Sequence, residues 1–225
     1  MTLPTLIAHY QEKVLVTAAK KDYSIIINAL NSWLIKNETP GDYKAFWLMS
    51  DSNEKLIEEL SKELKYVKLC STSYNVKNCG GTYDIRQYKK INNGLGQTTS
   101  ENWVSNLNRI ILSDGGFITI QLAHSDGSCI TKGWTYDKDA NGNYIEDPSS
   151  PNGYKGHETT NNVCGRIAYD TNGLKGPNQI GRDVFQIAFS NDGKIGTNYD
   201  SWGNINYVLS HDKLIQTENY VTGEY

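Results

Sequence analysis

The 225-residue sequence has no long apolar run. No stretch approaches the ~18 consecutive apolar residues that a membrane-spanning helix requires, and the mean hydropathy is −0.56. The opening Met1-Thr2-Leu3-Pro4 has neither the basic start nor the apolar core of a signal peptide. The chain as written is therefore expected to be soluble.

The sequence also has no excess of positive charge. Its 22 Lys and Arg residues stand against 25 Asp and Glu residues, which gives a formal net charge of −3 at pH 7 and a pI of about 5.8. Non-specific binding to nucleic acids depends on a broad positive field. No nucleic acid is therefore expected among the partners.

Motifs that assemble a catalytic centre are missing as well. The four histidines, His9, His124, His157 and His211, belong to no G-x-S-x-G or H-E-x-x-H pattern. His124-Ser125-Asp126 contains the residue types of a catalytic triad, but adjacent side chains at a strand end point in different directions, so a turn is the better interpretation. We expect a protein that is not an enzyme. A convergent pair of carboxylates in a deep cleft would instead indicate a secreted hydrolase.

Cysteine is scarce, but its even number is informative. Cys70, Cys79, Cys129 and Cys164 form no C-x-x-C pair and have no neighbouring histidine at zinc-ligand spacing. Four buried free thiols would indicate a cytosolic protein, whereas two disulfides indicate an oxidising compartment, which we favour. Three pairings are open. The local one, Cys70–Cys79 with Cys129–Cys164, closes the shortest loops and is the one we predict.

Apolar residues recur every three or four positions through the first 36 residues, which predicts one long helix over Pro4–Lys36. Proline suits the first turn, where its missing N–H costs nothing. A helix of about 50 Å usually extends beyond its own domain or belongs to an assembly. The apolar stripe is expected to pass beyond the globular part and to leave the residues near Leu3, Leu6 and Ile7 exposed.

Further helices and strands are predicted after the long helix. Capping spacing and apolar stripes indicate helices at about Asp51–Tyr66, with Asp51 and Glu54 as the capping pair, and at about Glu101–Leu112. A period of two and turn signals indicate strands at Ile118–Leu122, Val163–Tyr169, Val184–Ser190 and Lys194–Gly196. Helices followed by strands are typical of an α+β fold.

One oxygen-rich loop could hold a calcium ion. Asp137, Asp139 and Asn141 match the first half of a D-x-D-x-[DN]-G calcium loop, but Pro148 occupies the position of the bidentate Glu. The alternative is a hairpin tip, because Asn141-Gly142 is a type I′ turn signal between two short aromatic stretches. The hairpin tip is favoured, because half a motif specifies few ligands.

A second loop runs from Asp170 to Asp183. The side chains of Asp170, Asn172 and Asp183 could ligate a hard cation or accept bonds from loop N–H groups. We favour the second role, because Asp and Asn commonly bond the backbone in turns. We hypothesise a metal-free structural clamp for the sheet, formed by Asp170, Asn172, Gly173, Gly176, Pro177, Asn178, Gly181, Asp183 and Phe185.

Several stretches resemble bacterial prepilin-type proteins, which comprise type IV pilins, minor pilins and type II secretion pseudopilins. Met1–Lys13 resembles the stretch that follows the hydrophobic helix half in that family, and the likeness continues through Val14–Leu30. Ile111–Gly116 resembles an element of one subgroup. The most specific likeness is Cys164-Gly165 followed by D-x-N-G-x-K-G-P-N-x-x-G-x-D-x-F over Asp170–Phe185.

The resemblance implies a pilin-like α+β fold in one structural domain. Residues 1–36 would form the C-terminal half of a long helix that packs on the antiparallel sheet of a globular head, residues 37–225, with short extra helices and two disulfides. The implied function is that of a structural subunit of an extracellular type IV pilus or type II secretion pseudopilus. Its partners would be other subunits, reached through the N-terminal helix.

The leader, the G-F-x-x-x-E cleavage site and the apolar helix half of that family are not found in this sequence. We therefore expect a truncated form of a longer protein, or a relative that does not polymerise. Membrane anchoring before assembly, and an extracellular or periplasmic location on a cell-surface filament, are inferred for the parent protein.

An alternative function is that of an adhesin-like minor pilin or surface module that recognises glycan or protein. The sequence contains 15 Tyr and 5 Trp residues, many of them in the middle of the chain. A contiguous exposed aromatic patch would favour this alternative, whereas scattered buried aromatics would not. Apart from calcium, no cofactor is expected.

Overall fold

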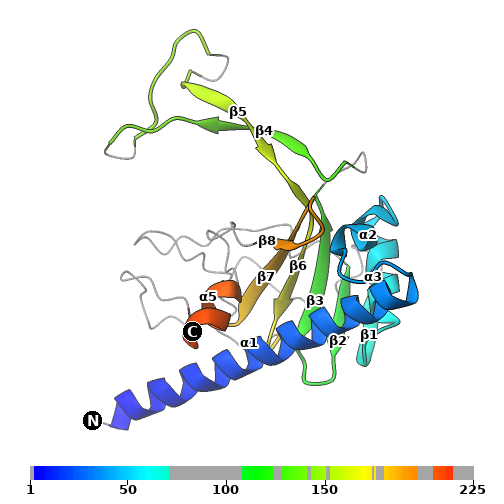
Figure 1. Cartoon of the computed structure of the whole chain (residues 1–225). Coiled ribbons are helices and arrows are strands. Elements are labelled where there is room, and N and C mark those ends of the chain that lie inside the picture. Colours follow the sequence, from blue (N-terminus) through cyan, green and yellow to red (C-terminus); the bar gives the residue numbers. More distant parts are fainter. Residues whose placement is uncertain are drawn as a thin grey trace.

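The computed structural model describes residues 3–70, 108–123, 128–140, 143–150, 153–173, 175, 180–196 and 205–214. Three helices come first and all the described strands follow them, so the α+β class is confirmed (Figure 1). Within these ranges, no helix has both the length and the apolarity needed to cross a membrane.

The long helix α1 (Leu3–Lys36) agrees with its predicted range. It ends in a Schellman-type turn. The N–H of Glu38, which has a φ of 60°, donates to the carbonyl of Ile35, and the N–H of Thr39 donates to the carbonyl of Leu34. Pro40 then follows, where it cannot interrupt the helix.

Two shorter helices follow, α2 (Tyr43–Leu48) and α3 (Asn53–Ser61). The sequence analysis did not predict α2, whose N-terminus is capped by the Asp42 carboxylate through the N–H of Lys44 at 3.1 Å. The predicted range Asp51–Tyr66 was too long for α3, which starts after Ser52 and ends before a strand. Asp51 was also the wrong cap.

The strands form a six-stranded antiparallel sheet in the order β1-β2-β3-β6-β7-β8, and β4 pairs with β5 in a separate two-stranded sheet. The bounds are β1 (Tyr66–Cys70), β2 (Arg109–Leu112), β3 (Phe117–Leu122), β4 (Thr131–Tyr136), β5 (Gly156–Asn161), β6 (Val163–Asp170), β7 (Val184–Ser190) and β8 (Ile195–Gly196). A last short helix, α5, covers Ile205–His211. The strands predicted near β3, β6, β7 and β8 are confirmed.

The helix predicted at Glu101–Leu112 is wrong in its described part. Residues 101–107 lie outside the described residues, and Arg109–Leu112 is the strand β2. Ile110 and Ile111 suit one face of a helix, but a short apolar run also suits a strand. The pairing of β2 with both β1 and β3 decides between them.

The core lies between the sheet and the helices α1, α2 and α3 (Figure 1). Trp47 of α2 is fully buried against β6 at Gly165. A Cβ at Gly165 would lie 2.1 Å from the Trp47 ring, so glycine is required for this close approach. Phe189 on β7 contacts the same ring at a centroid distance of 5.4 Å.

Candidate interaction surfaces

The first surface is an apolar stripe on the N-terminal half of α1. We call Leu6, Ile7, Tyr10 and Val14 the helix stripe; their exposed fractions are 57%, 49%, 70% and 47%. Spacings of three, four and seven residues place them on one side of the helix. Because this part of α1 extends beyond the head (Figure 1), the expectation of an exposed apolar stripe is confirmed at Leu6 and Ile7.

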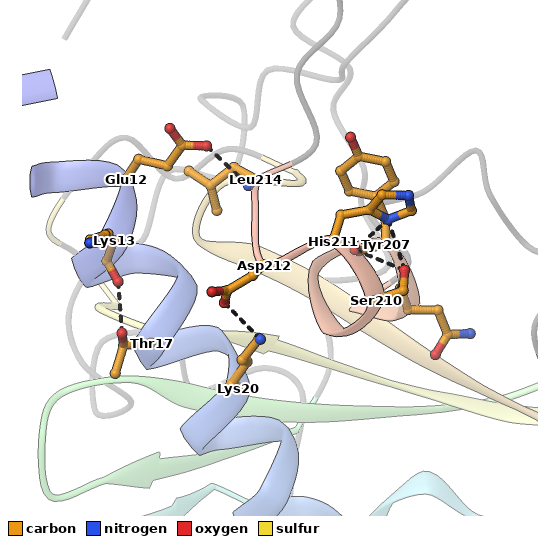
Figure 2. Close-up of polar contacts among 10 residues, drawn as sticks. Glu12, Lys13, Thr17, Lys20, Tyr207, Ser210, His211, Asp212 and Leu214 are labelled. Carbon is orange, nitrogen blue, oxygen red and sulfur yellow. Dashed lines mark hydrogen bonds and ion pairs between the residues drawn. The ribbon is translucent and has the colours of Figure 1, made fainter. Parts of the chain in front are cut away.

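The C-terminal segment marks where the head begins to hold α1 (Figure 2). The N–H of Leu214 donates to Glu12 at 3.3 Å, and the ammonium group of Lys20 bonds to Asp212 at 2.8 Å. The bond from Lys20 lowers the pKa of Asp212. Leu6, Ile7 and Tyr10 precede both contacts and Val14 lies between them, and all four side chains remain exposed.

The second surface lies on an arm, by which we mean β4, β5 and the described residues between them (top of Figure 1). Three chain segments meet at its centre in a cycle of backbone bonds. Asp137 N–H donates to Lys155 at 2.9 Å, Lys155 N–H to Ile145 at 2.8 Å, and Ile145 N–H back to Asp137 at 3.0 Å. This cycle fixes the positions of the residues that come directly before each of the three.

Those preceding residues are all tyrosines. Tyr136, Tyr144 and Tyr154 form a triangle with ring centroids 6.0, 6.1 and 5.7 Å apart. Tyr144 and Tyr154 expose 52% and 41% of their surface, and the Lys138 ammonium lies 4.8 Å from the Tyr144 ring centroid. The three rings support one another while much of their surface remains in water.

Trp134 extends this tyrosine triangle. It lies two residues before Tyr136 and so on the same side of β4, and it is 54% exposed. A Cβ at Gly156 would come within 2.4 Å of the indole nitrogen of Trp134, so the glycine makes room for the ring. We call Trp134, Tyr136, Tyr144 and Tyr154 the aromatic face.

The first calcium candidate lies within the arm. Asp137 bonds His157 Nδ1 at 2.9 Å, and Asp139 accepts the Asn143 N–H at 2.9 Å. The Asp139 N–H donates to the Asn143 carbonyl, so the chain reverses here as a hairpin tip does. Asn141 lies outside the described residues. Among the described residues, no three acidic, histidine or cysteine side chains converge as a metal site.

In the second loop, Asp170 makes bonds of the kind that a metal-free clamp requires. Its buried carboxylate accepts the N–H groups of Asn172 at 2.9 Å and Gly173 at 2.7 Å. The backbone of Thr171 donates to the carbonyl of Asp183, which closes the loop ends at 2.9 Å. The structure thus brings Asp170, Asn172 and Asp183 into one loop closure, and the effect of breaking it stays a prediction.

The structure describes some of the other residues of the predicted clamp, but not all of them. Gly173 has a φ of 64°, and a Cβ there would lie 2.1 Å from the Gly115 carbonyl oxygen, so the position requires glycine. Gly181 also has a positive φ, and its N–H donates to the Val184 carbonyl. Phe185 packs beside Tyr169 at 5.8 Å. Gly176, Pro177 and Asn178 lie outside the described residues, as does the His124–Asp126 turn.

The predicted Cys129–Cys164 disulfide is confirmed. It links the base of the arm to the six-stranded sheet, because Cys129 precedes β4 and Cys164 belongs to β6. Cys70 is also disulfide-bonded, whereas Cys79 lies outside the described residues. The Cys70–Cys79 pairing stays a prediction.

Asp22 was missed by the sequence analysis. It is only 1% exposed, and in the part of the chain that the structure describes neither of its carboxylate oxygens has a hydrogen-bond partner. An acidic residue three positions after Ala19 and four before Ile26, on the buried stripe of a helix, was a signal that could have found it.

No family model, curated protein or solved structure shows a significant match to the chain.

Proposed function

We propose that the protein is a structural subunit of an extracellular type IV pilus or type II secretion pseudopilus. The helix stripe is the observation that carries this proposal, because four large apolar side chains occupy one side of a helix that projects from its head. Burying such a side chain stabilises an assembly by roughly 1.5–3 kcal/mol. Helices of neighbouring subunits, packed side by side, would provide that cover.

The Cys129–Cys164 disulfide supports a location outside the reducing cytoplasm. A cell-surface filament, or its base in the periplasm, meets that requirement. The parent protein would be anchored in the membrane before assembly through an apolar helix half ahead of Leu3. The reading frame upstream of Met1 is the first check, and a G-F-x-x-x-E site followed by an apolar helix half is the expected result.

The assembly test uses the full parent gene in its source cell. Leu6→Glu with Tyr10→Glu should abolish filaments that contain this protein, because charge would enter the helix bundle. Ala8→Glu, at an exposed position on the opposite side of α1 from the helix stripe, is the matched control and should assemble. Unchanged melting of the purified variants would exclude misfolding. Normal assembly of the Leu6/Tyr10 variant would refute the proposal.

The aromatic face favours a second candidate, an adhesin-like minor pilin or surface module that binds glycan or protein. Exposed aromatic rings gathered on a projecting arm are typical of recognition surfaces rather than of a core. Trp134→Ala with Tyr144→Ser should lower binding to a glycan array or to intact cells at least tenfold. Thr135→Ala, which alters an exposed side chain on the other side of β4, is the control. Equal binding by all three proteins would exclude this role.

A further inference from the structure

A buried carboxyl side chain lies where α1 packs on the head. Asp22 is 1% exposed, and its helix neighbours Ala19 and Ile26 are fully buried. Neither carboxylate oxygen has a hydrogen-bond partner among the described residues. An ionised carboxylate at this place has lost its hydration, and no protein donor replaces the lost water.

The charges closest to Asp22 compensate its negative charge only in part. The ammonium group of Lys21 is bonded to Asp114, on the turn between β2 and β3. Burial alone would raise the pKa of Asp114, but the bonds from Lys21 and from the Gly116 N–H outweigh it and lower that pKa. Asp114 therefore stays ionised, and its charge opposes a second negative charge at Asp22.

The remaining groups around Asp22 are also committed or neutral. Lys20 is bonded to Asp212 beyond α5. Tyr169 on β6 donates its hydroxyl to the Ala19 carbonyl at 3.1 Å. Burial, then the charge of Asp22 and the neighbouring Tyr23, raises the pKa of Tyr169 well above its usual value, so the phenol stays protonated. Within the described part of the chain, both lysines next to Asp22 are therefore bonded to other carboxylates.

We propose that Asp22 is a proton-controlled latch between α1 and the head. The protonated carboxyl group lets α1 pack on the sheet. Loss of its proton to solvent places an unpaired charge in the interface and loosens the helix near the turn between β2 and β3. The inference concerns the chain itself and does not depend on the proposed filament.

The direction of the pH dependence follows from the two states of the group. Burial, and then the charge of Asp114, raises the pKa of Asp22 from 3.8 to about 7, with Lys21 acting in the opposite sense. The packed state therefore holds one more proton than the open state between about pH 4 and pH 7. Its population relative to the open state falls up to about tenfold per pH unit in that window and is constant above it.

Amide exchange over residues 16–26 of α1 tests the latch, after correction for the intrinsic pH dependence of exchange. In the wild-type chain, opening should increase up to about a hundredfold between pH 5 and pH 7 and level off by pH 8. Asp22→Asn has nearly the same shape and no charge, so its opening should not vary with pH. At pH 8 it should be better protected than the wild-type chain.

Two control variants locate the effect. Glu158→Gln removes an exposed acid on the arm, where it pairs with Lys132, and should keep the wild-type profile. Asp114→Asn removes the opposing charge and releases Lys21, so the midpoint should move to lower pH. Parallel profiles for wild type and Asp22→Asn would overturn the proposal. Independently of any variant, an NMR titration of the Asp22 carboxyl in the wild-type chain with a midpoint near pH 4 would overturn it too.

Discussion

The six-stranded sheet and the arm are both antiparallel, yet different forces hold them. In the sheet, β6 and β7 bury almost all of their side chains, many against α1 and α2. In the arm, two strands project from the head (Figure 1). Several of their aromatic rings are exposed. A pair of strands alone is marginally stable in water. The arm depends instead on the disulfide at its base, a cycle of backbone bonds and a triangle of tyrosines.

The largest expected difference in stability between the sheet and the arm concerns two tryptophans. Trp47→Ala should lower the free energy of unfolding by about 3–5 kcal/mol, because Trp47 is fully buried against Gly165 and Phe189. Trp134→Ala should cost less than ~1 kcal/mol, because the ring is half-exposed on the arm. Urea unfolding of the two variants measures both values. Equal losses would show that the arm is as tightly packed as the core.

The disulfide should matter most to the arm. Replacing both Cys129 and Cys164 by serine frees a loop with a sequence separation of 35, for which the chain-entropy model gives about 4 kcal/mol. Amide exchange should accelerate first at 131–136 and 156–161, while 184–190 in β7 should change only through global unfolding. Unchanged exchange in β4 and β5 would show that hydrogen bonds alone hold the arm to the head.

Much of the head could be predicted from local patterns. The spacing of apolar residues predicted α1, and alternation predicted the β7 strand at Val184–Ser190. The same reasoning failed at Ile110 and Ile111, whose spacing suits a helix as well as a strand. It also missed α2, because six residues carry too short a period and their burial against β6 is decided by tertiary packing.

The candidate surfaces were only partly predictable. The helix stripe follows from the length and period of α1, which are local properties. The tyrosine triangle does not, because Tyr136, Tyr144 and Tyr154 are eight and ten residues apart and meet through the backbone cycle at Asp137. The lack of an ion-pair partner for Asp22 could not be predicted from the sequence. It depends on the pairing of Lys21 with Asp114, which lies far along the chain.

An intermediate loss of stability is expected in the loop that joins β6 to β7. Asp170→Ala should cost about 1–3 kcal/mol, because the N–H groups of Asn172 and Gly173 would lose a buried acceptor. Asp137→Ala on the arm should cost less, because its bond to His157 is exposed. Melting curves of wild type and both variants provide the comparison.

The same melting curves, recorded with calcium and with EDTA, separate a metal-free clamp from a metal site. If the loop is a metal-free clamp, the melting temperature of Asp170→Ala should lie below that of the wild-type chain by the same amount with calcium and with EDTA. If calcium held the loop, EDTA would lower the melting temperature of the wild-type chain and remove most of the difference between the two proteins. A variant as stable as wild type in both buffers would remove the structural role.

The smallest expected effect concerns the rings of the arm. Tyr136 and Tyr144 lie edge to face at 6.0 Å, an arrangement in which the positive edge of one ring meets the negative face of the other. A double-mutant cycle with Tyr136→Leu and Tyr144→Leu should give a coupling energy of about 0.5–1.5 kcal/mol, measured by local amide exchange at 131–136. The same cycle between Trp134→Leu and Val67→Ala, two exposed residues on different sheets, should give no coupling.

Additive losses at Tyr136 and Tyr144 would mean that the rings do not stabilise one another, and the arm would then be held by its disulfide and backbone alone. A measured coupling would instead show that the rings are fixed in place before any ligand arrives, which is the condition under which an exposed aromatic surface binds without a large entropic penalty.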